Sequence, residues 1–388
     1  MTQFLERDGW MSRDDLAQLV AAVGPLRWVG GAVRDTLLDL SVKDIDAATP
    51  LLPDEVMARC KAAGIRTVPT GIEHGTVTAV LEGGPVEITT LRHDVSTDGR
   101  RATVAFAQDW RDDAARRDFT INALYADPIT GEIFDYFGGL DDLATRRVRF
   151  IGDAAQRIRE DHLRILRYFR FQARFGQIAD VEAEKACAAL AATLKGLSRE
   201  RIGMEMMNLL GLPDPAPTVA RMAQLGVLAV VLPEASPETL AQLVAQEKVE
   251  GVAPDALRRL AALLPANVSF AEQVASRFRL SGAQKKRLAA AAARDGQVGD
   301  ARALAYQLGM DGAMDRVLLC NGTIRDLRDW TIPVFPLKGG DIVARGIAAG
   351  PRIAQLLRMV ERLWVAEGFP DAARVDALLN EALNTEAP

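Results

Sequence analysis

Two glycines and an arginine near the N-terminus have the types and spacing that phosphate binding needs. Gly30-Gly31 follows the β-type run Arg27–Val29 and precedes a helix-like apolar pattern over residues 33–40. Glycines can turn the chain sharply there and point backbone N–H groups at an anion. Arg34 adds a fork of donors that suits phosphate oxygens.

Asp44-Ile45-Asp46 supplies two carboxylates at strand spacing. Residues i and i+2 of a strand point to one face, so we expect Asp44 and Asp46 side by side and Ile45 in a core. Adjacent carboxylates repel unless a cation compensates, and Mg²⁺ takes one or two carboxylates together with phosphates and water. Each motif alone is common in ordinary turns and loops. Together they predict an Mg²⁺-dependent nucleotide-transfer site.

Glu87 is a candidate third carboxylate for this site. The alternation in Val86–Thr90 places Val86 and Ile88 in a core and Glu87 on the opposite face. A carboxylate near the aspartate pair suits a two-metal centre. An exposed strand glutamate is the alternative that the sequence leaves open.

Asp161 and Arg164 could read a nucleobase. At i and i+3 of a helix the two side chains project together and present an acceptor beside donors. The Watson–Crick edges of cytosine and adenine carry an amino donor next to a ring-nitrogen acceptor, which complements this pair, whereas uracil and guanine carry the reverse order. The pair therefore predicts a site that accepts C and A without a template. An ordinary helical ion pair is the alternative.

The composition is that of an ordinary globular protein. The 388 residues exceed one typical domain of about 100 to 200 residues, so two to four compact units are expected. No apolar run approaches the roughly 18 residues of a membrane span, and the charged N-terminus does not resemble a signal peptide. These features predict a cytoplasmic protein with no membrane partner.

Cysteine and histidine usage excludes two classes of site. The three cysteines are far apart in the sequence and form no Cys-x-x-Cys pair, so neither a disulfide framework nor a zinc site is indicated. The three histidines are dispersed, which argues against a histidine-rich phosphohydrolase module.

The charge is distributed unevenly. The net charge is −5, but nine arginines and only three acidic residues lie between Arg146 and Arg174, which leaves +6 in a short segment. Nucleic-acid binding responds to local charge, so this segment could face phosphates.

The pattern predicts an α+β chain. Short β-type runs at residues 76–81, 86–90 and 132–136 alternate with helical stretches, and β signals almost vanish after residue 151. Breakers at residues 211–217 and 332–336 interrupt the helical part. We expect a head with a mixed sheet and helices at 1–149, followed by an all-α neck (150–212), body (213–331) and tail (332–388).

Four ordered motifs carry a resemblance to a known family. The sequence resembles class II of the tRNA nucleotidyltransferase and poly(A) polymerase family, in its bacterial form, whose head is similar to the palm of DNA polymerase beta. The motifs are Gly30–Asp35 with Asp44–Asp46, Arg116–Ala123, Glu160–Arg167, and Ser198–Arg201.

The resemblance implies roles for individual residues. Asp44 and Asp46 would be catalytic and hold Mg²⁺, with Glu87, proposed above from the strand pattern, as a third catalytic carboxylate, and the segment from Ser198 would steady the base-reading helix. The nucleotide-binding residues would be Gly30, Gly31 and Arg34 at the triphosphate, Arg117 and Asp118 at the sugar, Asp161 and Arg164 at the base, and Arg167 and Arg170 at the triphosphate or behind the base-reading pair.

The resemblance also implies a function: addition of CCA to the 3′ end of tRNA from CTP and ATP, with release of pyrophosphate. Residues 92–101 are polar and are expected to form a mobile loop, which in the family assists the adenosine step. The tail would contact tRNA through Gly-rich turns at residues 339–341 and 346–350.

Three alternatives stay open at this point. A poly(A) polymerase shares every motif, although residues 71–76 and 97–99 look more like the CCA-adding type. An enzyme that adds only CC or only A would share them too. A non-catalytic RNA-binding protein is the alternative from another class, and the sequence does not distinguish a monomer from a homodimer.

Overall fold

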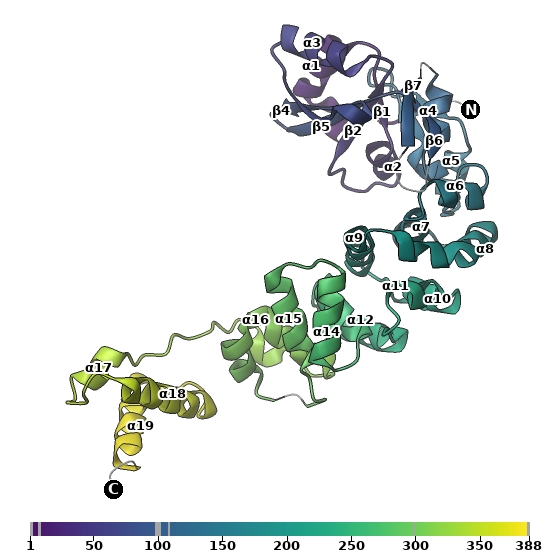
Figure 1. Cartoon of the computed structure of the whole chain (residues 1–388). Helices are drawn as coiled ribbons and strands as arrows, with labels where there is room; N and C mark the ends of the chain where they lie inside the picture. Colours follow the sequence, from purple (N-terminus) through teal and green to yellow (C-terminus); the bar gives the residue numbers. More distant parts are fainter. Residues whose placement is uncertain (1–2, 7–8, 98–101, 108, 298, 386–388) are drawn as a thin grey trace. The chain divides into compact units, whose positions relative to one another are not determined.

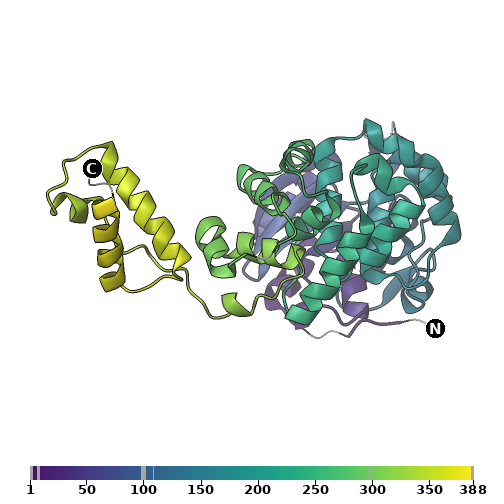
Figure 2. The same ribbon diagram turned by 90° about the horizontal axis from the view of Figure 1, so that it is seen from below.

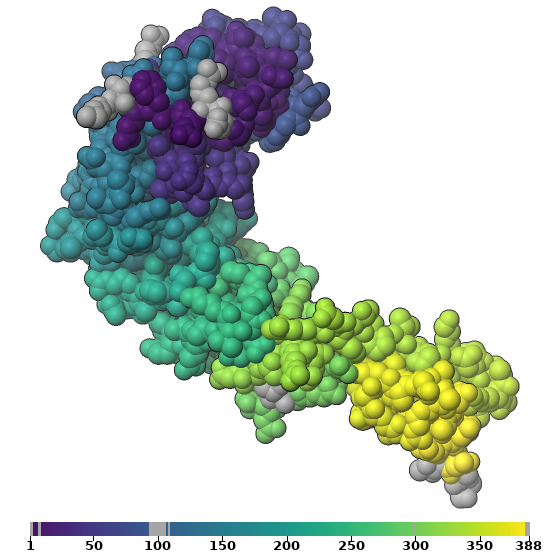
Figure 3. Space-filling model, turned by 180° about the vertical axis from the view of Figure 1, so that it is seen from behind, coloured from purple at the N-terminus to yellow at the C-terminus, as the bar shows by residue number. Residues whose placement is uncertain are grey.

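The computed structural model describes residues 3–6, 9–97, 102–107, 109–297 and 299–385. The chain divides into two compact units, Met1–Pro233 and Glu234–Pro388, which are described separately below. Figure 1 shows unit 1 in purple to teal and unit 2 in green to yellow, and the same colours mark their surfaces in Figure 3.

Unit 1 is built on a seven-stranded mixed sheet. The strand order is β3-β4-β5-β2-β1-β8-β9, and every neighbouring pair is antiparallel except β2 and β5, which run parallel. The strands are β1 Arg27–Val29, β2 Ile45–Thr49, β3 Arg66–Gly71, β4 Thr76–Leu81, β5 Gly84–Thr90, β8 Leu124–Ala126 and β9 Ile133–Asp135.

Helices lie between the strands of unit 1 along the sequence and make up its C-terminal part. Within the described residues, no strand follows β9, which confirms the predicted α+β organisation with a helical C-terminal part. The α-helices of unit 1 are α1 Asp14–Val23, α2 Gly31–Leu37, α3 Pro53–Ala62, α4 Trp110–Ala115, α5 Gly139–Ala144, α6 Ala154–Glu160, α7 Arg164–Phe175, α8 Val181–Leu190, α9 Arg199–Leu210, α10 Ala216–Gln224 and α11 Val227–Val231.

Two segments differ from the sequence predictions. Arg92–Thr97 is not a loop: it forms β6, which pairs with β7 Ala102–Phe106 in a separate two-stranded sheet, whereas residues 98–101 lie outside the described part. Phe119–Leu124 has a strand-like sequence, but Thr120–Asn122 form a 3-10 turn (η3), and only Leu124 of this segment belongs to a strand, β8. The Asp118 carboxylate accepts from the Phe119 N–H and the Asn122 amide and so favours this turn.

Unit 2 is helical throughout its described residues and has more than one hydrophobic cluster. One cluster lies around α12 (Pro237–Glu250) and α16 (Ala301–Leu319), and another around α18 (Pro351–Ala366) and α19 (Ala372–Thr385), which Figure 2 shows in yellow. The helices are α12 Pro237–Glu250, α13 Ala256–Leu263, α14 Val268–Arg277, α15 Gly282–Ala292, α16 Ala301–Leu319, α17 Gly339–Val343, α18 Pro351–Ala366 and α19 Ala372–Thr385.

The finer division into head, neck, body and tail stays a prediction. The breaker segment at 211–217 does separate α9 from α10, but both helices belong to unit 1. No helix in the described part of the chain is long and apolar enough to cross a membrane.

Candidate nucleotide-binding site

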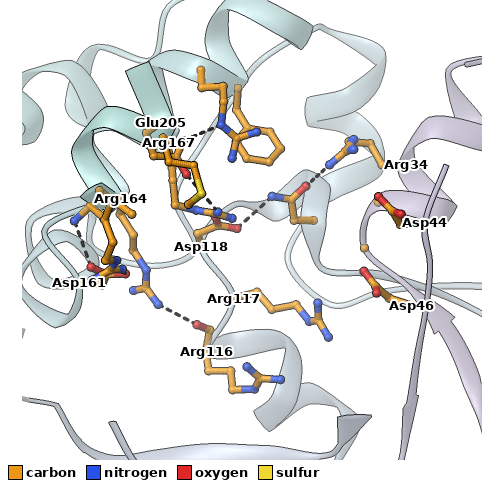
Figure 4. Close-up of a pocket in the computed structure, with 18 residues that line it drawn as sticks. Arg34, Asp44, Asp46, Arg116, Arg117, Asp118, Asp161, Arg164, Arg167 and Glu205 are labelled. Atoms are coloured by element: carbon orange, nitrogen blue, oxygen red, sulfur yellow. Dashed lines mark hydrogen bonds and ion pairs between the residues drawn. The ribbon is translucent and has the colours of Figure 1, made fainter. Parts of the chain in front are cut away.

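A cavity of about 780 Å³ in unit 1 brings the sequence-predicted residues together. Figure 4 shows its lining, with Asp44 and Asp46 on the right and Asp161 and Arg164 on the left. Every predicted site residue except Glu87 lines it, namely Gly30, Gly31, Arg34, Asp44, Asp46, Arg117, Asp118, Asp161, Arg164, Arg167 and Arg170. Arg34 and Asn122, which both line the cavity, are in direct contact although they lie 88 positions apart in the sequence.

The glycine turn after β1 has the geometry that its sequence predicts. Gly30 has φ +69°, a conformation that other residues rarely adopt, and α2 begins at Gly31. Arg34 follows one helical turn later and is only 5% exposed. Its guanidinium is held by Asp35 and by the Asn122 side chain and lies over the Phe175 ring, 4.3 Å from the centroid. Burial lowers the pKa of Arg34, and the Asp35 charge opposes this effect.

The two aspartates lie where β2 begins. Ile45 is buried as predicted, but the strand starts at Ile45, so Asp44 precedes it and is exposed, whereas Asp46 is half-buried. Burial raises the pKa of Asp46, and the neighbouring Glu87 and Asp44 charges raise it further, against the effect of Arg117. A bound cation would relieve this accumulation of negative charge.

Glu87 lies beside Asp46 on the adjacent parallel strand, in register with it. It is exposed between buried Val86 and Ile88, as the alternation predicts, but it is not a lining residue of the cavity. Among the described residues no group of three or more His, Cys, Asp or Glu side chains is arranged to hold a metal ion. The role of Glu87 as a third catalytic carboxylate therefore stays a prediction.

Asp118 accepts four hydrogen bonds from the protein. Its Oδ1 accepts from the Phe119 N–H (2.9 Å) and the Asn122 amide (3.0 Å), and its Oδ2 accepts from two nitrogens of Arg167 (2.8 and 2.6 Å). Burial acts to raise the pKa of Asp118, but Arg167 and the Asn122 hydrogen bond outweigh it and lower the pKa to about 2. The carboxylate is therefore ionised and firmly oriented.

Arg117 and its neighbour Arg116 both form ion pairs with one buried carboxylate. Asp113 is 1% exposed, and it pairs with both arginines and accepts from the Tyr125 hydroxyl at 2.6 Å. Burial disfavours the charged form of Arg117, but Tyr125 and Asp113 raise its pKa, so it stays cationic. Two cations thus line the cavity, and the charge of Arg117 acts on Asp46.

Asp161 and Arg164 both line the cavity, but they are not on one helix. The prediction of a continuous helix is wrong: α6 ends at Glu160, Asp161 has extended backbone angles, and α7 starts at Arg164. The Asp161 carboxylate accepts from the Leu163 N–H at 3.1 Å, an alternative to the helical backbone bond that favours a break. A turn bond from the Arg164 N–H to the Asp161 carbonyl keeps both residues at the same site.

Each member of this pair has its own support. Arg201 donates to Asp161 Oδ2 at 2.9 Å. Arg164 donates to Glu160 at 2.7 Å and to the Arg116 carbonyl at 3.1 Å, so its guanidinium is directed to a defined place. Figure 4 shows the resulting arrangement of an acceptor beside a cation at one end of the cavity.

Arg167 and Arg170 project from α7 toward Glu205 on α9. Glu205 is 4% exposed and accepts from Arg170 Nε at 2.6 Å, with Arg167 Nη1 3.8 Å from its other oxygen. Ser198 occupies the N-cap of α9 but makes no side-chain capping bond there. The supporting role of the Ser198–Arg201 segment thus has one direct contact to the site, from Arg201 to Asp161.

Sequence reasoning did not assign a site role to several lining residues. Arg201 and Glu205 are four residues apart, and helical spacing places them on one face of α9, a signal that could have been used. The sequence does not indicate a site role for Asn122 beyond its place in a motif, because its partners Arg34 and Asp118 lie on other elements. Arg201 is part of the supporting Ser198–Arg201 segment, and the lining residues without an assigned role are Arg116, Asn122, Leu163, Phe171, Met204 and Glu205.

Comparison with known proteins places this chain among enzymes of one kind. Residues 26–149 match the Poly A polymerase head domain, and residues 180–239 match a probable RNA and SrmB-binding site of polymerase A. CCA tRNA nucleotidyltransferase 1, mitochondrial, of Mus musculus is 35% identical over 367 residues, which cover 89% of this chain and 83% of that protein. The CCA-adding enzyme of Geobacillus thermodenitrificans is 41% identical over 202 residues, covering 52% and 49%.

A solved structure has the same arrangement of elements. The Bacillus stearothermophilus CCA-adding enzyme in complex with CTP matches with a TM-score of 0.77 at 29% identity, over 95% of this chain and 96% of that one. Identity and coverage at this level extend beyond the head to the helical part. The chain therefore belongs to the CCA-adding branch of the tRNA nucleotidyltransferase and poly(A) polymerase family.

Proposed function

We propose that this protein adds CCA to the 3′ end of tRNA from CTP and ATP, without a template and with release of pyrophosphate. The observation that carries the proposal is one cavity that holds both an aspartate pair and an acceptor–cation pair. The first pair suits nucleotidyl transfer, and the second suits selection of C and A. The names of the similar proteins support the same activity.

The protein's own residues position the reacting groups. Arg34 and the Gly30-Gly31 turn hold the triphosphate, with Arg34 fixed by its buried partners. Arg117 and Asp118 lie between the phosphate and base ends and hold the sugar. The RNA 3′-hydroxyl attacks the α-phosphate, and pyrophosphate leaves. Positioning and electrostatic stabilisation supply the rate.

Asp44 and Asp46 are the residues that would hold Mg²⁺. Two carboxylates that crowd one another, together with triphosphate oxygens, form the donor set that Mg²⁺ prefers. The chemistry that bound Mg²⁺ would supply there is activation of the attacking hydroxyl and neutralisation of phosphate charge. The exposed position of Asp44 leaves it open to solvent and substrate.

Base selection depends on the Asp161 acceptor and the Arg164 donors. The amino group of cytosine or adenine donates to Asp161, and the ring nitrogen accepts from Arg164. Uracil and guanine would set acceptor against acceptor and donor against donor, and unpaired buried polar groups lose about 1–3 kcal/mol each. The break between α6 and α7 presents both groups at the same end of the cavity.

The decisive experiment supplies one labelled nucleotide at a time to a tRNA that lacks its 3′ CCA. CMP addition from CTP alone, followed by a single AMP when ATP is added, is the expected result. Long A tails from ATP alone would show a poly(A) polymerase, and RNA binding without pyrophosphate release would show a non-catalytic protein. Either outcome would overturn the proposal.

Location and assembly are also part of the proposal. We place the protein in the cytoplasm with tRNA, CTP and ATP as its partners, and the choice between monomer and homodimer is to be made by sedimentation. Cell fractionation with an antibody against the chain tests the location.

A further inference from the structure

Asn122 joins two parts of the cavity that the proposed function assigns to different groups of the nucleotide. Its side-chain oxygen accepts from Arg34 Nη1 at 2.5 Å, and its side-chain nitrogen donates to Asp118 Oδ1 at 3.0 Å. The residue is 8% exposed and lines the cavity. In Figure 4 the dashed contacts run without a break from Arg34 to Asp118.

The chemistry of the partners fixes the orientation of this amide. Arg34 can only donate, and an ionised carboxylate such as Asp118 can only accept. Only an asparagine or a group with the same two faces satisfies both. An aspartate at this position would keep the contact to Arg34 but place a second carboxylate against Asp118.

The contact has a consequence for the spacing of the site. Asp118 is held on its other sides by the Phe119 N–H and by Arg167, and Arg34 is held by Asp35. Asn122 is therefore the member that fixes the distance between the phosphate-holding cation and the sugar-facing carboxylate. The network continues from Arg167 to Glu205, so this spacing is anchored on α9.

We infer that Asn122 is a positioning residue that sets ribose selection by holding Asp118 at a fixed distance from Arg34. This inference rests on the proposed function. A ribonucleotide bound through its triphosphate offers a 2′-hydroxyl to Asp118, whereas a deoxyribonucleotide has no such group. Loss of Asn122 loosens the carboxylate and weakens the contact that only the ribonucleotide makes.

The experiment compares CTP and dCTP in single-turnover incorporation on a tRNA that lacks CCA. Asn122→Ala should lower the ratio of kcat/KM for CTP to that for dCTP by about tenfold, the factor for one well-placed hydrogen bond to a charged group. The choice of C and A over U and G should not change. Equal losses for CTP and dCTP would show a merely structural role and overturn the inference.

Two further variants test whether the change in the CTP-to-dCTP ratio is specific to Asn122 and acts through Asp118. Gln224→Ala is the matched control, because it removes an exposed side-chain amide outside the cavity whose oxygen accepts a hydrogen bond from Arg221 (3.0 Å), and it should leave the ratio unchanged. Asp118→Ala already removes the sugar contact, so adding Asn122→Ala to it should change the ratio by less than about twofold. Independent, multiplying effects would contradict action through Asp118.

Further measurements distinguish a loss of folding from a loss of ribose selection. Circular dichroism melting identifies a variant that does not fold, and Asn122→Ser then replaces Asn122→Ala with the same decision rule, because a shorter side chain cannot span both partners. Failure of the wild-type chain to add CMP would refute the proposed function. An active wild type whose variant keeps the full CTP preference would refute only the inference about Asn122.

Discussion

Replacing Asp118 by asparagine should change how the stability of unit 1 depends on pH. In the folded protein the pKa of Asp118 is about 2, against 3.8 for an ordinary aspartate, because Arg167 and Asn122 outweigh the effect of burial. At about 1.4 kcal/mol per pKa unit, this difference corresponds to about 2 kcal/mol of stability. A lowered pKa gives stability that is fully present above pH 4 and is lost as the pH falls toward 2.

The assay is urea unfolding at several pH values between 7 and 2.5. Trp330→Phe and Trp364→Phe in both chains restrict tryptophan fluorescence to Trp10, Trp28 and Trp110, which all belong to unit 1. Asp118→Asn should lower the free energy of unfolding by about 2 kcal/mol or more at pH 7, since Arg167 also loses its partner.

The sign of the pH dependence is the critical point. The difference between the two chains should shrink between pH 4 and pH 2.5, because the Asp118 carboxylate of the unfolded wild-type chain, with its ordinary pKa of 3.8, takes up a proton there while the folded one stays mostly ionised. The exposed Asp112→Asn is the control and should show no such change. A difference that stays constant from pH 7 to pH 2.5 would refute the ionised, Arg167-paired state of Asp118.

Three further predictions concern catalysis. Asp44→Ala should lower incorporation of both CMP and AMP by about a thousandfold while tRNA binding in a filter assay persists; normal CMP addition by this variant would refute the assigned mechanism. Arg164→Ala should mainly relax nucleotide choice, raising UMP and GMP incorporation relative to CMP by about 10- to 100-fold in single-nucleotide assays. Removal of divalent cations with EDTA should stop both additions, and Mg²⁺ should restore them; unchanged rates in EDTA would exclude the role of the aspartate pair in metal binding.

The sequence predicts the parts of the site that depend on local periodicity. Arg27–Val29 and Thr76–Leu81 form strands with the predicted bounds, and the burial of Val86 and Ile88 around Glu87 follows the predicted alternation. These features depend on residues that are close in the sequence, so the two-residue periodicity of a strand is enough to predict them.

Side-chain hydrogen bonds, one local and others between distant elements, account for what the sequence did not predict. Glu160-Asp161-His162-Leu163-Arg164 has the composition of a helix, but the Asp161 side chain bonds to a nearby backbone N–H and breaks it. Asn122 acquires its place only when Arg34 and Asp118 come from different elements to meet its two faces. Side chains that join distant segments leave no periodic signal.

The ion pair between Asp118 and Arg167 also bears on biosynthesis. The two residues are 49 positions apart, and Arg167 lies on α7, after the last strand of the sheet. A nascent chain leaves the ribosome N-terminus first, so the sheet is synthesised before the cation that keeps Asp118 ionised. Until α7 has emerged, the sheet contains a carboxylate that is costly to bury. The smallest part of the chain that can complete this fold during translation therefore extends beyond the sheet into the helices that follow it.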